Sequence, residues 1–113
     1  MFLKFRNMKK IIFILIIFIL INGCNNNSNN IDKKLAKCIS EKSVIYISAG
    51  CVACAKQREL FGENFDELNV VDCAMEPEKC RDADIIVVPT WIINDNIYKG
   101  VQKIEELKEL TGC

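Results

Sequence analysis

The chain has 113 residues, with 15 basic and 15 acidic side chains, seven cysteines and no histidine. A chain of this length can form one small domain and no more. The lack of histidine removes the commonest general base and the commonest zinc ligand. No basic patch with interleaved aromatic residues is present, so a nucleic-acid partner is not expected.

The first 23 residues have the features of a signal peptide. A basic start, which ends at Lys10, precedes an unbroken apolar run of eleven residues from Ile11 to Ile21. That run is too short to span a bilayer as a helix, but it fits the apolar core of a signal peptide. Ile21-Asn22-Gly23-Cys24 resembles the lipobox of bacterial lipoproteins, in which the cysteine is lipidated and begins the mature protein. The alternatives are an uncleaved membrane anchor and ordinary cleavage that leaves Cys24 as a thiol.

Residues 24–30 are expected to form a flexible tether. The run from Asn25 to Asn30, NNNSNN, has no apolar side chain to bury and no charge. It therefore cannot offset the entropy cost of folding. We expect residues 31–113 to form the folded domain. Cleavage before Cys24 leaves 11 basic against 15 acidic side chains, a net charge of about −4.

The rest of the chain predicts alternating helices and strands, from the spacing of its apolar residues and the positions of its turn residues. The expected elements, in chain order, are a helix over Ile31–Ile39, a strand at Val44–Ile47, a helix over Cys51–Leu60 that continues to Leu68 after a kink, a strand at Val70–Val71, a short helix opened by Pro77, an apolar run at Ile85–Val88 that Trp91–Ile93 continue after Pro89, a turn at Asn94–Asn96, a returning strand at Ile97–Tyr98, and a helix over Ile104–Leu110.

This order predicts an α/β fold. Strands that alternate with helices pair in parallel, and the hairpin around the Asn94–Asn96 turn adds an antiparallel edge. The expected architecture is a central four-stranded mixed sheet flanked by helices on both faces.

Six cysteines follow Cys24, and an even number in a small exported domain indicates disulfide bonds. They are Cys38, Cys51, Cys54, Cys73, Cys80 and Cys113. Six cysteines allow fifteen pairings, so the fold has to decide which ones form.

Cys51 and Cys54 form a Cys-x-x-Cys pair directly after a strand and in the first turn of a helix. The free amides and the positive end of the helix favour the thiolate of Cys51 over its thiol. Cys54 lies one turn on, close enough to attack a mixed disulfide. Cys51 is therefore the expected exposed nucleophile and Cys54 the shielded resolving cysteine. The other interpretations are a purely structural disulfide and a metal site shared with Cys73 and Cys80, whose spacing is wide for a zinc ligand pair.

The second feature is Val88-Pro89-Thr90-Trp91, where a proline interrupts an apolar strand pattern. Proline cannot donate to a central ladder, so it marks a bulge, an edge or a cis bond. A strand, a Cys-x-x-Cys helix and such a proline about 35 residues later resemble the thioredoxin-like family. In that family a cis-proline loop faces the active disulfide and presents its backbone to an extended substrate. The resemblance assigns substrate binding to Val88 and Pro89. Trp91 is expected to be either a packed aromatic residue or a substrate-binding residue of the groove, rather than a catalytic group.

A closer resemblance covers nearly all of residues 31–113. The segments "KQRELFGENFDELNVVDC", "VPTWIIN" and "YKGVQKIEELKELTGC" look like the thioredoxin-like domain of bacterial vitamin K epoxide reductase homologues and its stand-alone relatives. The resemblance implies thiol-disulfide exchange in the exported compartment, without a dissociable cofactor, because the disulfide carries the two electrons. It also implies a structural disulfide between Cys73 and Cys80.

The chain departs from that family near its cysteine pair. Gly50 stands where an aromatic residue usually precedes Cys51, and Val52-Ala53 replaces the usual Pro-His. Without that histidine the Cys51 thiolate loses one stabilising group, so we expect a couple that is less oxidising than typical relatives. Val88 replaces the usual aromatic residue before the proline, which alters the expected substrate preference.

Cys38 and Cys113 complete the set. A bridge between them would tie both ends of the domain to the core, whereas Cys113 is otherwise a free thiol or pairs with another chain. Together these features predict a lipid-anchored oxidoreductase that faces the periplasm or the exterior of a bacterial cell envelope. Its expected partners are exported cysteine-containing proteins. The family resemblance alone implies a membrane reductase of the vitamin K epoxide reductase type as the electron partner. The rival is a non-enzymatic lipoprotein module that binds metal or a protein partner.

Overall fold

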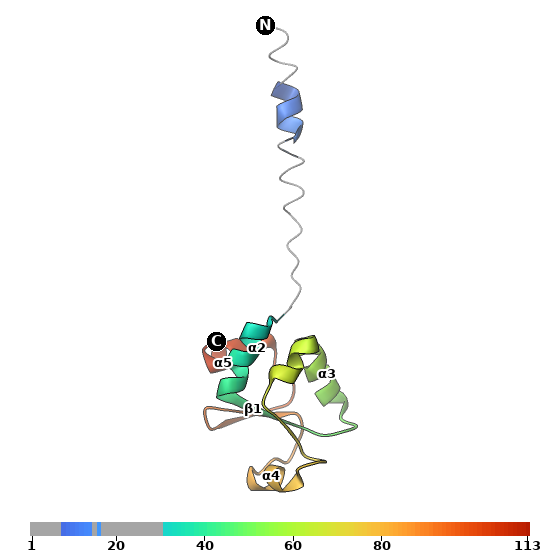
Figure 1. The fold of residues 1–113 in the computed structure, drawn as a ribbon, viewed down its shortest axis with the longest axis vertical. Helices are drawn as coiled ribbons and strands as arrows, with labels where there is room; N and C mark the ends of the chain where they lie inside the picture. Colours follow the sequence, from blue (N-terminus) through green and yellow to red (C-terminus); the bar gives the residue numbers. More distant parts are fainter. Residues whose placement is uncertain (1–7, 15, 17–30) are drawn as a thin grey trace.

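The computed structural model describes residues 8–14, 16 and 31–113 (Figure 1). The predicted cleavage site, the lipidation site Cys24 and the Asn-rich tether lie outside these residues. Among the helices that the structure describes, none is long and apolar enough to cross a membrane.

The domain contains a four-stranded sheet in the order β2-β1-β3-β4. Strand β1 pairs in parallel with β2 and antiparallel with β3, and β3 pairs antiparallel with β4. The elements are α2 (Lys33–Lys42), β1 (Ser43–Ile47), α3 (Val52–Phe61), the 3₁₀-helix η1 (Gly62–Glu67), β2 (Val70–Asp72), α4 (Pro77–Asp82), β3 (Thr90–Ile93), β4 (Asn96–Lys99) and α5 (Ile104–Thr111). The predicted α/β fold, with a central mixed four-stranded sheet flanked by helices, is confirmed.

The side chains of β1 alternate between two cores. Ile45 and Ile47 point toward the larger one, which α2, α3, η1 and α5 cover together with Trp91 and Ile93 of β3. Tyr46 points the other way, into a smaller core beneath α4. Figure 1 shows α4 on the opposite side of the sheet from α2, α3 and α5. Both faces of the central strand are therefore buried, as a strand with an almost continuous apolar sequence requires.

Local sequence explains where α2 begins and how β3 turns into β4. The Asp32 carboxylate caps α2 by accepting a hydrogen bond from the Leu35 backbone N–H at 2.7 Å. Asn94 and Asp95 both have positive φ, 50° and 64°, which is the two-residue turn that joins twisted antiparallel strands. Asn and Asp tolerate this conformation better than most residues.

The prediction that Ile85–Val88 begins a strand is wrong. This segment is a loop, and β3 begins only at Thr90. Pro89 has no N–H to give to a ladder, so the pairing of β3 with β1 starts after it. The side chains of Ile86 and Val87 are exposed, at 76% and 44% of their surface.

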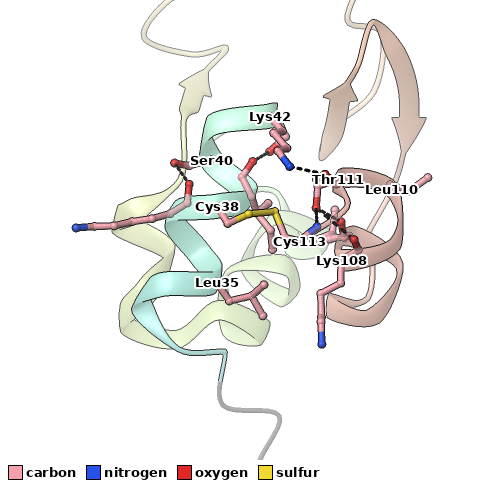
Figure 2. Close-up of a disulfide and its surroundings, with 12 residues drawn as sticks. Leu35, Cys38, Ser40, Lys42, Lys108, Leu110, Thr111 and Cys113 are labelled. Carbon is pink, nitrogen blue, oxygen red and sulfur yellow. Dashed lines mark hydrogen bonds between the residues drawn. A yellow bond between two sulfur atoms is a disulfide. The ribbon is translucent and has the colours of Figure 1, made fainter.

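The two ends of the domain are joined covalently. Cys38 of α2 forms a disulfide with Cys113, beyond α5, with a Cα–Cα distance of 6.1 Å (Figure 2). The Lys42 ammonium adds a hydrogen bond to the Thr111 carbonyl at 3.0 Å. Of the alternatives for these cysteines, the structure therefore shows the intramolecular bridge. It holds α2 and α5 side by side over the larger core.

Candidate redox site

Cys51 is the N-cap residue of α3, immediately after the loop that leaves β1. Its Sγ accepts a hydrogen bond from the backbone N–H of Cys54 at 3.1 Å. The two cysteines form a disulfide with a Cα–Cα distance of 5.2 Å. Cys51 is partly exposed, whereas Cys54 is buried, with 5% of its surface accessible. The structure thus brings both predicted cysteines together and leaves only the first open to a partner.

The end of α3 gives the two sulfurs different electrostatic environments. The Cys51 sulfur lies at the positive end of the helix dipole and accepts a backbone amide hydrogen bond, and both favour its thiolate once the disulfide opens. Cys54 lies within the apolar core, where a charged sulfur is poorly solvated. Cys51 is therefore the better leaving group, and Cys54 favours returning to the disulfide.

The Pro89 segment lies against Cys51. The Sγ of Cys51 is 3.5 Å from the carbonyl oxygen of Val88. The Val88-Pro89 peptide bond is cis, and the Pro89 ring is fully buried. The backbone N–H of Gly100 donates a hydrogen bond to the Pro89 carbonyl at 2.8 Å and so connects this segment to the chain after β4. The structure thus places Val88 and Pro89 beside Cys51, as expected from the sequence.

Trp91 does not belong to an open groove. Its side chain is fully buried in the larger core, where its ring centroid lies 5.9 Å from that of Phe61. A docked substrate cannot reach it, so of the two interpretations of Trp91 the structure shows the packed aromatic residue and not the groove residue. An indole carries enough apolar surface to favour the interior when its N–H finds a partner there, and the Trp91 N–H does.

That partner is Gln57, which the sequence analysis missed. Gln57 is fully buried on α3, and its Oε1 accepts hydrogen bonds from Trp91 Nε1 at 3.1 Å and from the Gln102 N–H at 2.7 Å. Its Nε2 donates to the Gln102 carbonyl at 3.0 Å. The available signal was spacing, because Cys54, Gln57 and Phe61 lie on one helical stripe where a polar residue needs buried partners.

The surface near the disulfide is apolar. Five large apolar side chains of residues 31–113 are exposed. Four of them lie just after β1 or β2 or shortly before β3, which is the end of the sheet where Cys51 lies. These four, which we call the apolar rim, are Val52, Met75, Ile86 and Val87. Exposed apolar side chains gathered at one edge indicate a binding surface.

The remaining cysteines form a third disulfide. Cys73, just after β2, is bonded to Cys80 in α4, with a Cα–Cα distance of 5.6 Å. This bond closes the loop over the smaller core, where Cys80 is buried. With all six cysteines of residues 31–113 in disulfides, no group of three or more potential metal ligands occurs in the described parts of the chain.

No protein-family model matches the chain. A curated relative, thiol-disulfide oxidoreductase LTO1 of Arabidopsis thaliana, is 40% identical over an alignment of 77 residues, and the match covers 60% of this chain and 20% of that protein. The chain thus spans about a fifth of that relative. A solved structure, the NTD_N/C domain of alkylhydroperoxide reductase AhpF from Enterococcus faecalis, is 18% identical with a TM-score of 0.44, covering 71% of this chain and 44% of that one. In sequence, the chain is similar to one segment of a thiol-disulfide oxidoreductase.

Proposed function

We propose that the chain is a thiol-disulfide oxidoreductase that exchanges disulfides with exported proteins through Cys51-Val52-Ala53-Cys54. The observation that carries the proposal is the setting of Cys51. Its sulfur is partly exposed, caps a helix and lies 3.5 Å from the Val88 carbonyl, while its partner Cys54 is buried. The sequence similarity to a thiol-disulfide oxidoreductase supports the same activity.

The oxidising reaction uses both cysteines in turn. A client thiolate attacks the Cys51 sulfur, which forms a mixed disulfide and releases Cys54 as a thiolate that takes up a proton. A second client thiolate then attacks the client sulfur of the mixed disulfide and releases the Cys51 thiolate. The client gains a disulfide, and the Cys51–Cys54 pair gains two electrons and two protons. The reducing reaction is the reverse of these steps.

The surroundings of Cys51 favour an extended polypeptide as substrate. The Val88 carbonyl beside the sulfur is a backbone acceptor that a client N–H can reach. The apolar rim offers side-chain contacts, and Val52, the residue of the rim that follows Cys51, is 86% exposed. No charged residue occurs from Ser43 to Ala55 or from Ile85 to Ile93, so the sequence near the site imposes no charge on its clients.

We further propose that the protein is anchored in a bacterial cell envelope by a lipid on Cys24 and faces the periplasm or the exterior. The support is the order of basic start, apolar run, glycine and cysteine at residues 1–24. A membrane reductase of the vitamin K epoxide reductase type is the proposed electron partner, on the basis of the family resemblance. The seven cysteines fit an oxidising compartment.

Insulin reduction with dithiothreitol as electron donor tests the activity. The unmodified protein should precipitate insulin chains faster than dithiothreitol alone, and Cys51→Ser and Cys54→Ser should each abolish this acceleration. The matched control is Cys73→Ala/Cys80→Ala, which removes a disulfide away from Cys51 and should retain turnover. Insulin reduction that survives Cys51→Ser would refute the proposed function.

A further inference from the structure

Gln57 connects three segments of the domain through one side-chain amide. It lies on α3, it accepts the indole N–H of Trp91 on β3, and it bonds both the N–H and the carbonyl of Gln102 in the segment before α5. Gln57 and Trp91 are fully buried. Hydrogen bonds shielded from water in this way are costly to break, because the groups left behind find no other partner.

Both hydrogen-bond partners of Gln57, Trp91 and Gln102, lie close to residues that are connected to Pro89. Trp91 lies on β3, two residues after Pro89. Gln102 lies two residues after Gly100, whose N–H donates to the Pro89 carbonyl at 2.8 Å. Gln57 itself lies one helical turn after Cys54. The amide is thus a bridge between the helix that carries the disulfide and the segment that Cys51 faces.

We propose that Gln57 is a positioning residue that fixes α3 against the Pro89 segment. It thereby fixes the slot between Cys51 and the Pro89 segment, the space in which a substrate sulfur approaches Cys51. This inference rests on the proposed function. Exchange requires the client sulfur, Cys51 and Cys54 to lie nearly in line, and a displacement of about 1 Å can cost about 100-fold in rate. A neutral amide supplies this rigidity without placing a charge beside the buried Cys54.

The test compares Gln57→Met with the unmodified full-length protein in detergent. Methionine matches the length of glutamine but makes none of the three hydrogen bonds. We expect kcat/KM for insulin reduction to fall by about tenfold or more. Alkylation of reduced Cys51 by iodoacetamide should change by less than about twofold, because this small reagent needs Cys51 alone. The emission of Trp91, the single tryptophan, should remain that of a buried indole and reports that the core is intact.

Thr111→Val is the matched control. Thr111 is also buried, and its hydroxyl donates to the Leu107 carbonyl at 2.6 Å, at the end of α5 beside Cys113. Its replacement removes a buried hydrogen bond without touching the Pro89 segment. Both the insulin rate and the alkylation rate should stay within about twofold of the unmodified protein.

Gln57→Glu supplies a readout that loss of stability alone would not give. Burial raises the pKa of the new carboxyl group, and in its protonated form it can donate to the Gln102 carbonyl as the amide does. The groups bonded to Gln57 are neutral. The charged residues next to Gln57 in the sequence, Lys56 and Arg58, are exposed, and so is Lys103, which follows its partner Gln102. Relative to the unmodified protein at each pH, turnover should be close to normal at low pH and fall as the carboxyl ionises.

The outcomes separate this inference from the proposed function. Normal insulin turnover by folded Gln57→Met, alkylation that slows by the same factor as turnover, or a Gln57→Glu ratio independent of pH would each overturn the positioning role. Absence of turnover in the unmodified protein would overturn the proposed function, and the positioning role with it. If Gln57→Met does not fold, the pH series of Gln57→Glu decides.

Discussion

The two residues between Cys51 and Cys54 bear on how strongly the disulfide oxidises its partners. A histidine at this place would add a positive charge near the Cys51 thiolate, but Ala53 adds none. What remains is the helix dipole and the Cys54 N–H at 3.1 Å. A less stabilised thiolate makes the reduced form less favourable and the disulfide a weaker oxidant.

We therefore predict that Ala53→His makes the Cys51–Cys54 couple more oxidising, by on the order of 30 mV, which is a tenfold change in the exchange constant. Equilibration with glutathione buffers at defined pH measures both potentials. Ala53→Gln, which adds size without a charge, is the control and should leave the potential nearly unchanged. An unmodified protein already near −120 mV, the strongly oxidising end of this class, would contradict the argument.

The apolar rim gives a second prediction at this scale. Ile86→Asp should raise KM for insulin severalfold, because a carboxylate replaces an apolar contact at 76% exposure beside the proposed slot. The iodoacetamide rate of Cys51 should stay the same. Ile97→Asp, at a side chain 50% exposed on β4, is the control and should leave KM unchanged. Equal effects of both changes on KM would show that the rim has no special part in binding.

At the scale of elements, apolar periodicity and turn residues predicted every helix and strand of residues 31–113 except the start of β3. The segment Ile85–Val88 carries the residues of a buried strand, yet it forms a loop because pairing begins after Pro89. Two of its residues, Ile86 and Val87, are left exposed at the end of the sheet where Cys51 lies. A propensity argument assigns apolar β-branched residues to the interior and cannot anticipate that two of them lie on the surface.

The site residues also divide into those that local sequence predicts and those that it does not. Cys51, Cys54, Val88 and Pro89 could be placed from the sequence because their motifs fix their position relative to a strand and a helix. The bridge made by Gln57 could not, because its partners Trp91 and Gln102 lie 34 and 45 residues away. Contacts at such separations depend on how α3 packs on the sheet, which local patterns do not specify.

The two structural disulfides close loops of different length, so their removal should lower the free energy of unfolding by different amounts. Cys38–Cys113 closes a separation of 75 residues, whereas Cys73–Cys80 closes one of 7. Loop-closure entropy predicts that replacing the first pair by alanine lowers the free energy of unfolding by about 4 kcal/mol and replacing the second by about 2 kcal/mol. Urea unfolding at equilibrium measures both losses. A larger loss from the short link would refute this ordering.

At the scale of the whole molecule, the chain joins an N-terminal segment with the features of a lipoprotein signal to a domain stapled by three disulfides. A domain of this size buries a small core, so covalent links carry part of its stability. The Cys38–Cys113 and Cys73–Cys80 disulfides constrain the fold, whereas the Cys51–Cys54 disulfide has one partly exposed sulfur.

The lipid anchor gives the prediction at this scale. In bacterial cells grown with a radiolabelled fatty acid, the unmodified protein should carry the label and lack its first 23 residues. Cys24→Ser should carry no label and keep those residues, because the modified cysteine defines the cleavage site in lipoproteins. Mass spectrometry of both proteins gives the second reading. An unlabelled protein with Cys24 intact would exclude the anchor.

The most direct test of the redox function is to trap partners with Cys54→Ser in bacterial cells. Without its resolving cysteine, Cys51 should remain in mixed disulfides, seen as high-mass bands that vanish on reduction. Cys51→Ser/Cys54→Ser, with neither sulfur of the pair, should show none of these bands. Mixed disulfides equally abundant in the double variant, or absent from Cys54→Ser, would contradict the assignment of Cys51 as the exchanging sulfur.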